Sequence, residues 1–122
     1  MESSNFNYRV LLKHFIANSI FTEKQISIIY NKILKAKPAE NITSGAYYRQ
    51  LGQSRNKTTK VVYTLLLLRL VNAIDTETFS VLRELNNQLN VILSKRSDEI
   101  HATALNDVIL LIDNVIKKLI LV

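Results

Sequence analysis

ITSGAYYRQLGQSRNKTTKVVYTLLLLRLV, residues 42–71, is the stretch that decides the fold. It contains no proline, and Thr43 or Ser44 near its start can cap the first amides of a helix. We therefore predict one long helix that reaches about Val71, with a break near Gly52 or at Asn56 as the alternative. The whole chain of 122 residues has two glycines and one proline, too few turn residues for an all-β domain. The sequence predicts an all-α fold.

Capping residues and helical spacing predict four further helices, which span about residues 5–18, 22–37, 76–95 and 97 to near the C-terminus. The second of these helices begins with Thr22-x-x-Gln25, a capping-box pattern, and should end before Pro38. Asp75 and Ser97 are the expected N-caps of the last two. We expect one domain of about five helices, with a helix-turn-helix-like part over 1–74 and a helical hairpin over 75–122.

Apolar side chains recur at alternating spacings of three and four in both helices of this hairpin, the pattern of coiled-coil positions a and d. The nine seam residues are Leu82, Leu85, Leu89, Ile92, Leu105, Val108, Ile112, Val115 and Leu119. Phe79 and Val122 are expected to extend the two seams. The seam residues predict a homodimer interface. The same pattern also fits a hairpin packed within one chain, and both can hold together.

Positive charge is concentrated in the first part of the chain. Residues 1–74 contain 11 Lys and Arg against 3 Asp and Glu, whereas residues 75–122 contain 5 against 7. Residues 41–74 contain five cations and no acid. A solvated helix face usually mixes both signs, because opposite charges three or four residues apart pair locally. The segregation indicates a polyanionic partner for the first part.

The long central helix should present its polar residues on one face. Because each residue of a helix turns about 100°, four of these side chains fall within about 60° of one another. They are Arg49, Gln53, Asn56 and Lys60. The opposite half should face a core, and it contains Tyr47, Leu51, Thr58, Val61, Val62 and Leu65. Gly45 and Gly52 lie along the polar side, where a glycine lets the backbone approach a partner.

Such a face suits double-stranded DNA. Arg and Lys neutralise phosphates and release counterions, and Arg, Gln and Asn can pair with base edges in a major groove that admits a helix. The residues expected to contact DNA are Ser44, Tyr48, Arg49, Gln50, Gln53, Arg55, Asn56, Lys57 and Lys60, together with Lys35 and Lys37 before Pro38. Amides at the helix start, at Ser44, can hold a phosphate.

Nothing in the sequence favours an enzyme. His14 and His101 lie in different predicted helices without metal-type spacing, and there is no cysteine or phosphate-binding glycine loop. We expect no cofactor, no metal and no small-molecule substrate. The longest unbroken apolar run, Val108 to Ile112, is far below the roughly 20 residues that span a bilayer, and so is the run from Leu65 to Leu68. With no signal-like start, a cytoplasmic, nucleoid-associated location is expected.

Residues 42–71 also resemble the central segment of a small all-helical domain family of ammonia-oxidising archaea. In that family a GxYYRxLxQxR stretch leads into an apolar YTxLLL helix. The domain occurs alone or beside bacterio-opsin-activator-like helix-turn-helix regulators. The resemblance implies a homodimer that binds double-stranded DNA with little sequence preference. It covers about 30 residues and carries over to Tyr47, Tyr48, Arg49, Gln53 and Arg55.

These features together predict a homodimeric DNA-binding protein, a transcription regulator or nucleoid protein of low sequence specificity. Three alternatives remain open at the level of sequence. The hairpin seams could make the protein an interaction module of a larger regulator. The apolar, lysine-tipped last helix could lie on an anionic membrane surface. RNA could replace DNA, although a helix does not enter the narrow major groove of an RNA duplex.

Overall fold

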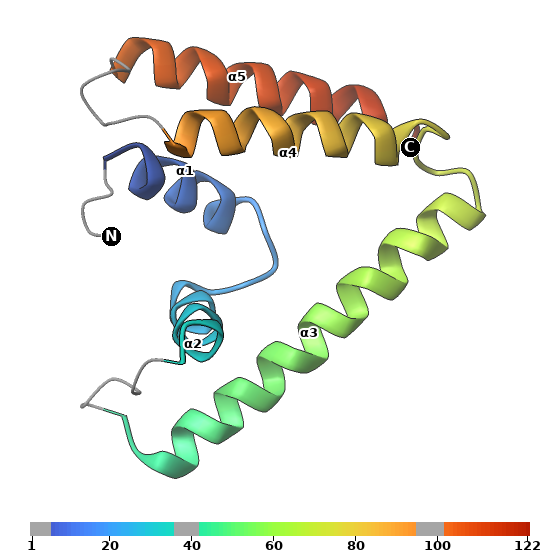
Figure 1. Cartoon of the computed structure of the whole chain (residues 1–122). Helices are drawn as coiled ribbons and strands as arrows, with labels where there is room; N and C mark the ends of the chain where they lie inside the picture. Colours follow the sequence, from blue (N-terminus) through green and yellow to red (C-terminus); the bar gives the residue numbers. More distant parts are fainter. Residues whose placement is uncertain (1–5, 36–41, 95–101) are drawn as a thin grey trace. The chain divides into compact units, whose positions relative to one another are not determined.

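The computed structural model describes residues 6–35, 42–94 and 102–122 and contains five helices (Figure 1). They are α1 (Phe6–Ala17), α2 (Glu23–Ile33), α3 (Ser44–Leu70), α4 (Thr78–Ser94) and α5 (Ala102–Leu119). No strand forms among the described residues, and a single isolated bridge joins Ile74 to Ile120. The all-α prediction is confirmed. The expected cap at Ser97 lies outside the described residues, as does Lys37.

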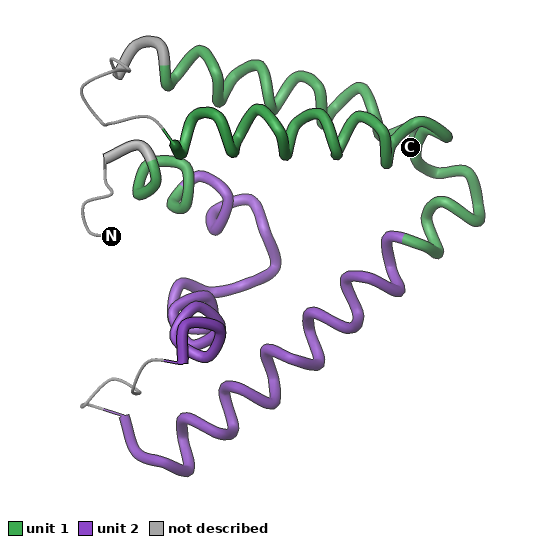
Figure 2. The backbone as a smooth tube through the Cα atoms, viewed as in Figure 1, with its two compact units in different colours: residues 1–13, 66–122 green, residues 14–65 purple. Residues whose placement is uncertain are grey.

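The chain divides into two compact units, coloured separately in Figure 2. Unit 1 comprises residues 1–13 and 66–122, and unit 2 comprises residues 14–65. Helices α1 and α3 each contribute residues to both units. The division therefore does not follow the change in net charge at residue 74.

Helix α3 is continuous and capped at both ends, and the predicted cap is the one at its start. The Thr43 hydroxyl accepts a hydrogen bond from the Ala46 amide at 3.1 Å. At the other end Asn72 takes the left-handed conformation with φ 63°, and the Ala73 amide donates to the Leu68 carbonyl at 2.8 Å. These are the features of a Schellman cap. The alternative break near Gly52 does not occur, and neither glycine has a positive φ.

Unit 1 contains the hairpin of α4 and α5, which run antiparallel in Figure 1. Its buried side chains are Leu85 and Ile92 on α4 and Leu105, Ile112 and Leu119 on α5. The other seam residues, Leu82, Leu89, Val108 and Val115, are half-buried. Because the successive buried residues on each helix are seven apart, each helix buries one stripe. The five buried residues thus serve the core of one chain, which corrects their assignment to a surface between two chains.

Backbone hydrogen bonds fix the open end of this hairpin. The Asp75 amide donates to the Leu119 carbonyl at 2.9 Å, and the Leu121 amide donates to the Ala73 carbonyl at 2.9 Å. The Asp75 carboxylate accepts a hydrogen bond from the Glu77 amide at 2.7 Å, but the first carbonyl of α4 to accept a helical bond is that of Glu77, so the prediction of Asp75 as the N-cap is wrong by two residues. Since residues 73–75 are held in this bridge, α4 begins at Thr78, two residues later than expected.

Two apolar residues at the edges of the predicted seams are exposed. Phe79, in the first turn of α4, is 42% exposed, and the terminal Val122 is 95% exposed. Val122 continues the spacing of its seam, whereas the alternation in α4 leads back from Leu82 to Thr78, which is buried in place of Phe79. Val122 follows the end of α5 at Leu119, so the helical spacing no longer determines where its side chain lies. The prediction that these two residues extend the buried stripes is wrong.

Unit 2 packs α2 against the first half of α3. Its core cluster consists of Ile28 on α2 with Tyr47 and Leu51 on α3, and Ile42 packs against them. Helical spacing predicts an apolar side on α2 that includes Ile33, but Ile33 is 71% exposed. The helix instead buries Gln25 and Ile28, which lie three residues apart.

Candidate nucleic-acid interface

The N-terminus of α2 is fixed by the predicted capping box. The Gln25 amide donates to the Thr22 hydroxyl at 3.1 Å, and the Thr22 amide donates to the Gln25 side-chain oxygen at 3.2 Å. This exchange satisfies two backbone donors at a helix start that has no intrahelical acceptors. It also holds the buried Gln25 carboxamide in one orientation, in which its oxygen can accept a hydrogen bond from a side chain of α3.

Lys57 of α3 joins this capping box. Its ammonium group donates to the Gln25 side-chain oxygen at 2.8 Å and to the Ile20 carbonyl at 3.0 Å. The same nitrogen lies 5.7 Å from the centre of the Phe21 ring, within cation–π range. Lys57 therefore ties α3 to the turn between α1 and α2. Two hydrogen bonds of its ammonium group are thus made inside unit 2, and its contact with DNA stays a prediction.

The side of α3 that faces α2 consists of Tyr47, Leu51 and Ser54, spaced four and three residues apart. Ser54 is 1% exposed, and its hydroxyl has no hydrogen-bond partner within the part of the chain that is described. A small side chain at this position permits close helix packing. Sequence reasoning did not single out Ser54, although it continues the spacing of Tyr47 and Leu51.

The buried side of α3 ends earlier than predicted. Thr58, Val61 and Val62 were expected to face a core, but all three are exposed, and Leu65 is half-buried. Past Ser54, α3 buries no residue completely. The packed side of α3 is therefore restricted to the polar first half of the helix.

The predicted polar stripe of α3 lies on the side of the helix opposite the one that packs on α2. Arg49, Gln53, Asn56 and Lys60 are all exposed. By helical phase the centre of this stripe lies roughly 150° from the centre of the buried side. A Cβ atom added to Gly45 or Gly52 would meet no heavy atom within 4 Å, so both glycines border open space. The structure thus brings together the four donors that the sequence placed on one face.

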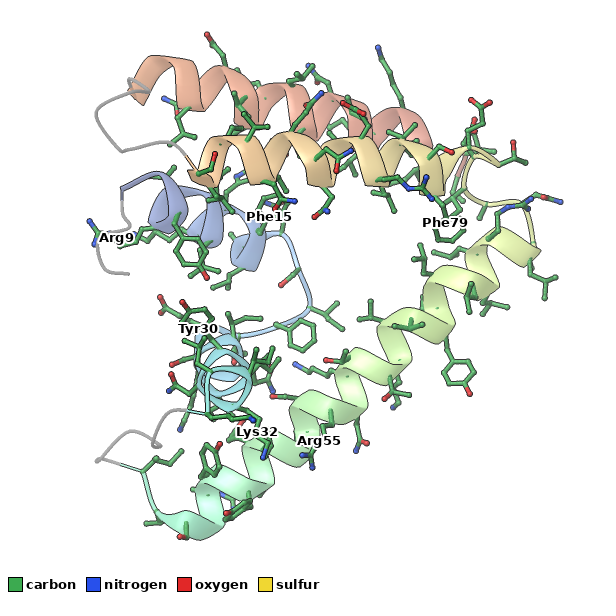
Figure 3. The ribbon with its side chains drawn as sticks, viewed as in Figure 1. Arg9, Phe15, Tyr30, Lys32, Arg55 and Phe79 are labelled. Atoms are coloured by element: carbon green, nitrogen blue, oxygen red, sulfur yellow. The ribbon has the colours of Figure 1, made fainter. Side chains whose placement is uncertain are left out.

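The other predicted contact residues lie outside this stripe. Ser44, Tyr48 and Arg55 are exposed on one side of it, roughly 110–150° around the helix from its centre, and Figure 3 shows Arg55 extending away from α2. The Tyr48 ring packs edge-on against that of Tyr47, with centroids 5.2 Å apart. On the other flank, Gln50 is half-buried.

Lys35 is exposed directly after the end of α2. Its backbone is left-handed, with φ 58°, and its amide donates to the Lys32 carbonyl at 3.1 Å. The residue therefore ends α2 in a conformation that usually favours glycine. Its ammonium group lies on the surface of unit 2.

The excess positive charge of the chain belongs to unit 2. Residues 14–65 contain eight Lys and Arg against two Asp and Glu, a net charge of +6. The residues of unit 1 contain eight of each and are neutral. The exposed stripe of α3 therefore lies in the unit that carries the entire net charge, which favours an anionic partner.

No group of three His, Asp or Glu side chains that could hold a metal ion occurs among the described residues. Within residues 6–35, 42–94 and 102–122, no helix combines the length and the apolar character that crossing a membrane requires.

No protein-family model, curated protein or solved structure matches the chain.

Proposed function

We propose that this protein binds double-stranded DNA through the first half of α3, as a homodimer. One observation carries the proposal. The stripe of Arg49, Gln53, Asn56 and Lys60 is exposed opposite the side that packs on α2, on a helix without a single acidic residue. A row of donors on a rigid helix is positioned to meet phosphate oxygens and base edges together.

The chemistry of the stripe favours affinity over sequence discrimination. Arg49 and Lys60 would neutralise phosphates and release counterions, which supplies most of the free energy of non-specific binding. Gln53 and Asn56 can form hydrogen bonds with base edges in the major groove. Two amide side chains provide few specific contacts, so we expect modest sequence preference.

The flank of the stripe suits the DNA backbone. Arg55 and Tyr48 are exposed roughly 110–130° around α3 from the centre of the stripe, where they can meet phosphates at the rim of the groove. The start of α3 adds the amides of Ser44 and Gly45, because the Thr43 cap uses the amide of Ala46. Helices α2 and α3 would then act as a helix-turn-helix-like pair, with a longer connection than the usual tight turn.

The proposal also draws on the resemblance of residues 42–71 to the archaeal DNA-binding domains. The residues that carry the resemblance include three of the exposed cations and amides, Arg49, Gln53 and Arg55. A role as a transcription regulator or nucleoid protein in the cytoplasm would follow from such binding.

Binding of a labelled random-sequence DNA duplex at low salt, followed by fluorescence anisotropy, tests the proposal. We expect saturable binding that an unlabelled DNA duplex of unrelated sequence displaces. An RNA duplex of the same length should displace it less well, because a helix cannot enter the deep and narrow major groove of A-form RNA. Absence of binding at low salt would refute the proposal. Stronger displacement by RNA would refute the assignment to DNA.

A further inference from the structure

Lys57 lies between the packed side and the exposed stripe of α3. By helical phase it lies about 90° around the helix from the centre of the packed side, Tyr47, Leu51 and Ser54, and about 70° from the centre of the stripe. Its half-buried side chain reaches the Ile20 carbonyl in the turn before α2. All of these residues belong to unit 2, drawn in purple in Figure 2, so the contact lies within one compact unit.

The packed side alone does little to stop α3 from rotating about its own axis. Tyr47 and Leu51 pack on Ile28, and apolar contacts of this kind are non-directional. The next residue on that side is Ser54, a small side chain whose hydroxyl has no hydrogen-bond partner among the described residues. The last two residues of the stripe follow Ser54 in the sequence, so their direction depends on another contact.

Lys57 supplies directional contacts at this point of the helix. Its ammonium group donates to the Gln25 side-chain oxygen at 2.8 Å and to the Ile20 carbonyl at 3.0 Å. The Gln25 oxygen is itself held in place, because the Thr22 amide donates to it at 3.2 Å. Hydrogen bonds from a charged donor are the strong ones. Because they act well to one side of the packed side, these bonds oppose a rotation of α3.

We propose that Lys57 is a positioning residue for DNA binding, which directs the exposed stripe toward the duplex through Gln25 and does not itself contact a phosphate. The inference rests on the proposed function and assigns Lys57 a role in it. Asn56 is adjacent to Lys57, and Lys60 follows about 4.5 Å along the helix. A rotation by about 30° would move a side chain 5–6 Å from the axis by about 3 Å, the length of a hydrogen bond.

Direct contact of Lys57 with a phosphate, which the sequence predicts, is the alternative role. A lysine that reaches out to the duplex gives up both of its bonds inside unit 2. Weakening the hold of Gln25 on the ammonium group would then favour DNA binding, and strengthening it would oppose DNA binding. For a positioning residue the effects of these two changes are reversed. The two roles therefore predict opposite orders of affinity.

Two variants of Gln25 separate the roles, because this uncharged side chain is 6% exposed and is bonded to Lys57. Gln25→Met removes the acceptor, whereas Gln25→Glu keeps an acceptor and suits the capping box equally well. Fluorescence anisotropy with a random-sequence DNA duplex measures affinity, at a temperature where circular dichroism shows each variant folded. We expect Gln25→Met to bind about tenfold more weakly than the wild type, as for the loss of one good contact, and Gln25→Glu to bind more tightly than Gln25→Met. Equal affinities or the reverse order would overturn the inference.

Thr22→Ala is the control for lost stability alone. It removes the N-cap hydroxyl of α2 but keeps the bond between Lys57 and Gln25, so it should bind DNA like the wild type. Binding as weak as that of Gln25→Met would overturn the inference, because stability and not position would then explain both losses. If Gln25→Met does not fold, Gln25→Glu decides alone: affinity within about threefold of the wild type supports positioning, and a larger loss overturns it.

A double variant supplies an independent test. Lys57→Met added to Gln25→Met should weaken binding by no more than about twofold, because the bond between the two residues is already absent. Losses that multiply would overturn the inference. A wild type that binds no DNA would refute the proposed function and this inference with it, whereas the reverse order of the Gln25 variants, with a wild type that binds, would overturn this inference alone.

Discussion

Replacement of Lys57 by alanine should destabilise unit 2 without removing any residue of the exposed stripe. The change deletes two hydrogen bonds from an ammonium group, at 2.8 and 3.0 Å, and the contact with the Phe21 ring. Lys57 is half-exposed, so each charged hydrogen bond is worth about 1 kcal/mol, below the usual range for such bonds. The ring contact adds about 0.5 kcal/mol. The expected loss of unfolding free energy is about 2–2.5 kcal/mol.

Urea unfolding followed by circular dichroism measures this loss. For a chain of this length, a loss of about 2 kcal/mol lowers the melting temperature by roughly 8 °C. Lys60→Ala is the matched control, because it removes the same charge from an exposed position and should change stability by less than about 0.5 kcal/mol. A Lys57→Ala variant as stable as Lys60→Ala would refute the structural role of Lys57.

Four other substitutions test local features, each by the same unfolding measurement. Ser54→Ala should stabilise by about 1 kcal/mol, because it removes a buried hydroxyl without a partner; destabilisation would mean that the hydroxyl is bonded. Lys35→Gly should stabilise by about 0.5–1 kcal/mol by relieving the left-handed backbone, and a loss would contradict that conformation. Thr22→Ala should cost about 1 kcal/mol, since it removes the N-cap of α2; no change would argue against the capping box. Leu105→Ala should cost about 2–5 kcal/mol as a core truncation, whereas Leu110→Ala should have little effect.

The helices could be predicted because their limits are set by short-range chemistry. Thr22 with Gln25, and Thr43, each cap through atoms three residues away, so the sequence alone contains both partners. The length of α3 was predictable for the same reason, since no proline interrupts it and its cap lies beside its first turn. Such local signals determine where an element begins and ends.

The side that each helix buries depends on partners far away in the sequence. Lys57 forms a hydrogen bond with Gln25, 32 residues earlier in the sequence. The residues adjacent to either one in the sequence do not predict this contact. For α2, apolar spacing favoured the side of Ile33, whereas the structure buries Gln25 beside Ile28. Periodicity shows that a helix has an apolar side, but packing decides how the helix is rotated.

The exposed stripe of the candidate site was predictable, because its cationic and amide residues recur at helical spacing. Arg49, Gln53, Asn56 and Lys60 are exposed together, as their spacing indicates. The coiled-coil spacing of α4 and α5 identified true core residues, but it could not distinguish packing within a chain from packing between chains.

The salt dependence of DNA binding in two charge-matched variants tests the central claim most directly. One variant replaces Arg49, Arg55 and Lys60 by alanine. The other variant replaces Arg83, Lys117 and Lys118, which are exposed in unit 1, by alanine. Each variant therefore loses three positive charges. If α3 binds the duplex, the first variant should flatten the slope of log K against log salt by about 2.7, or 0.9 for each lost phosphate contact. The second should keep the wild-type slope. Equal slopes for the two variants would contradict binding through α3.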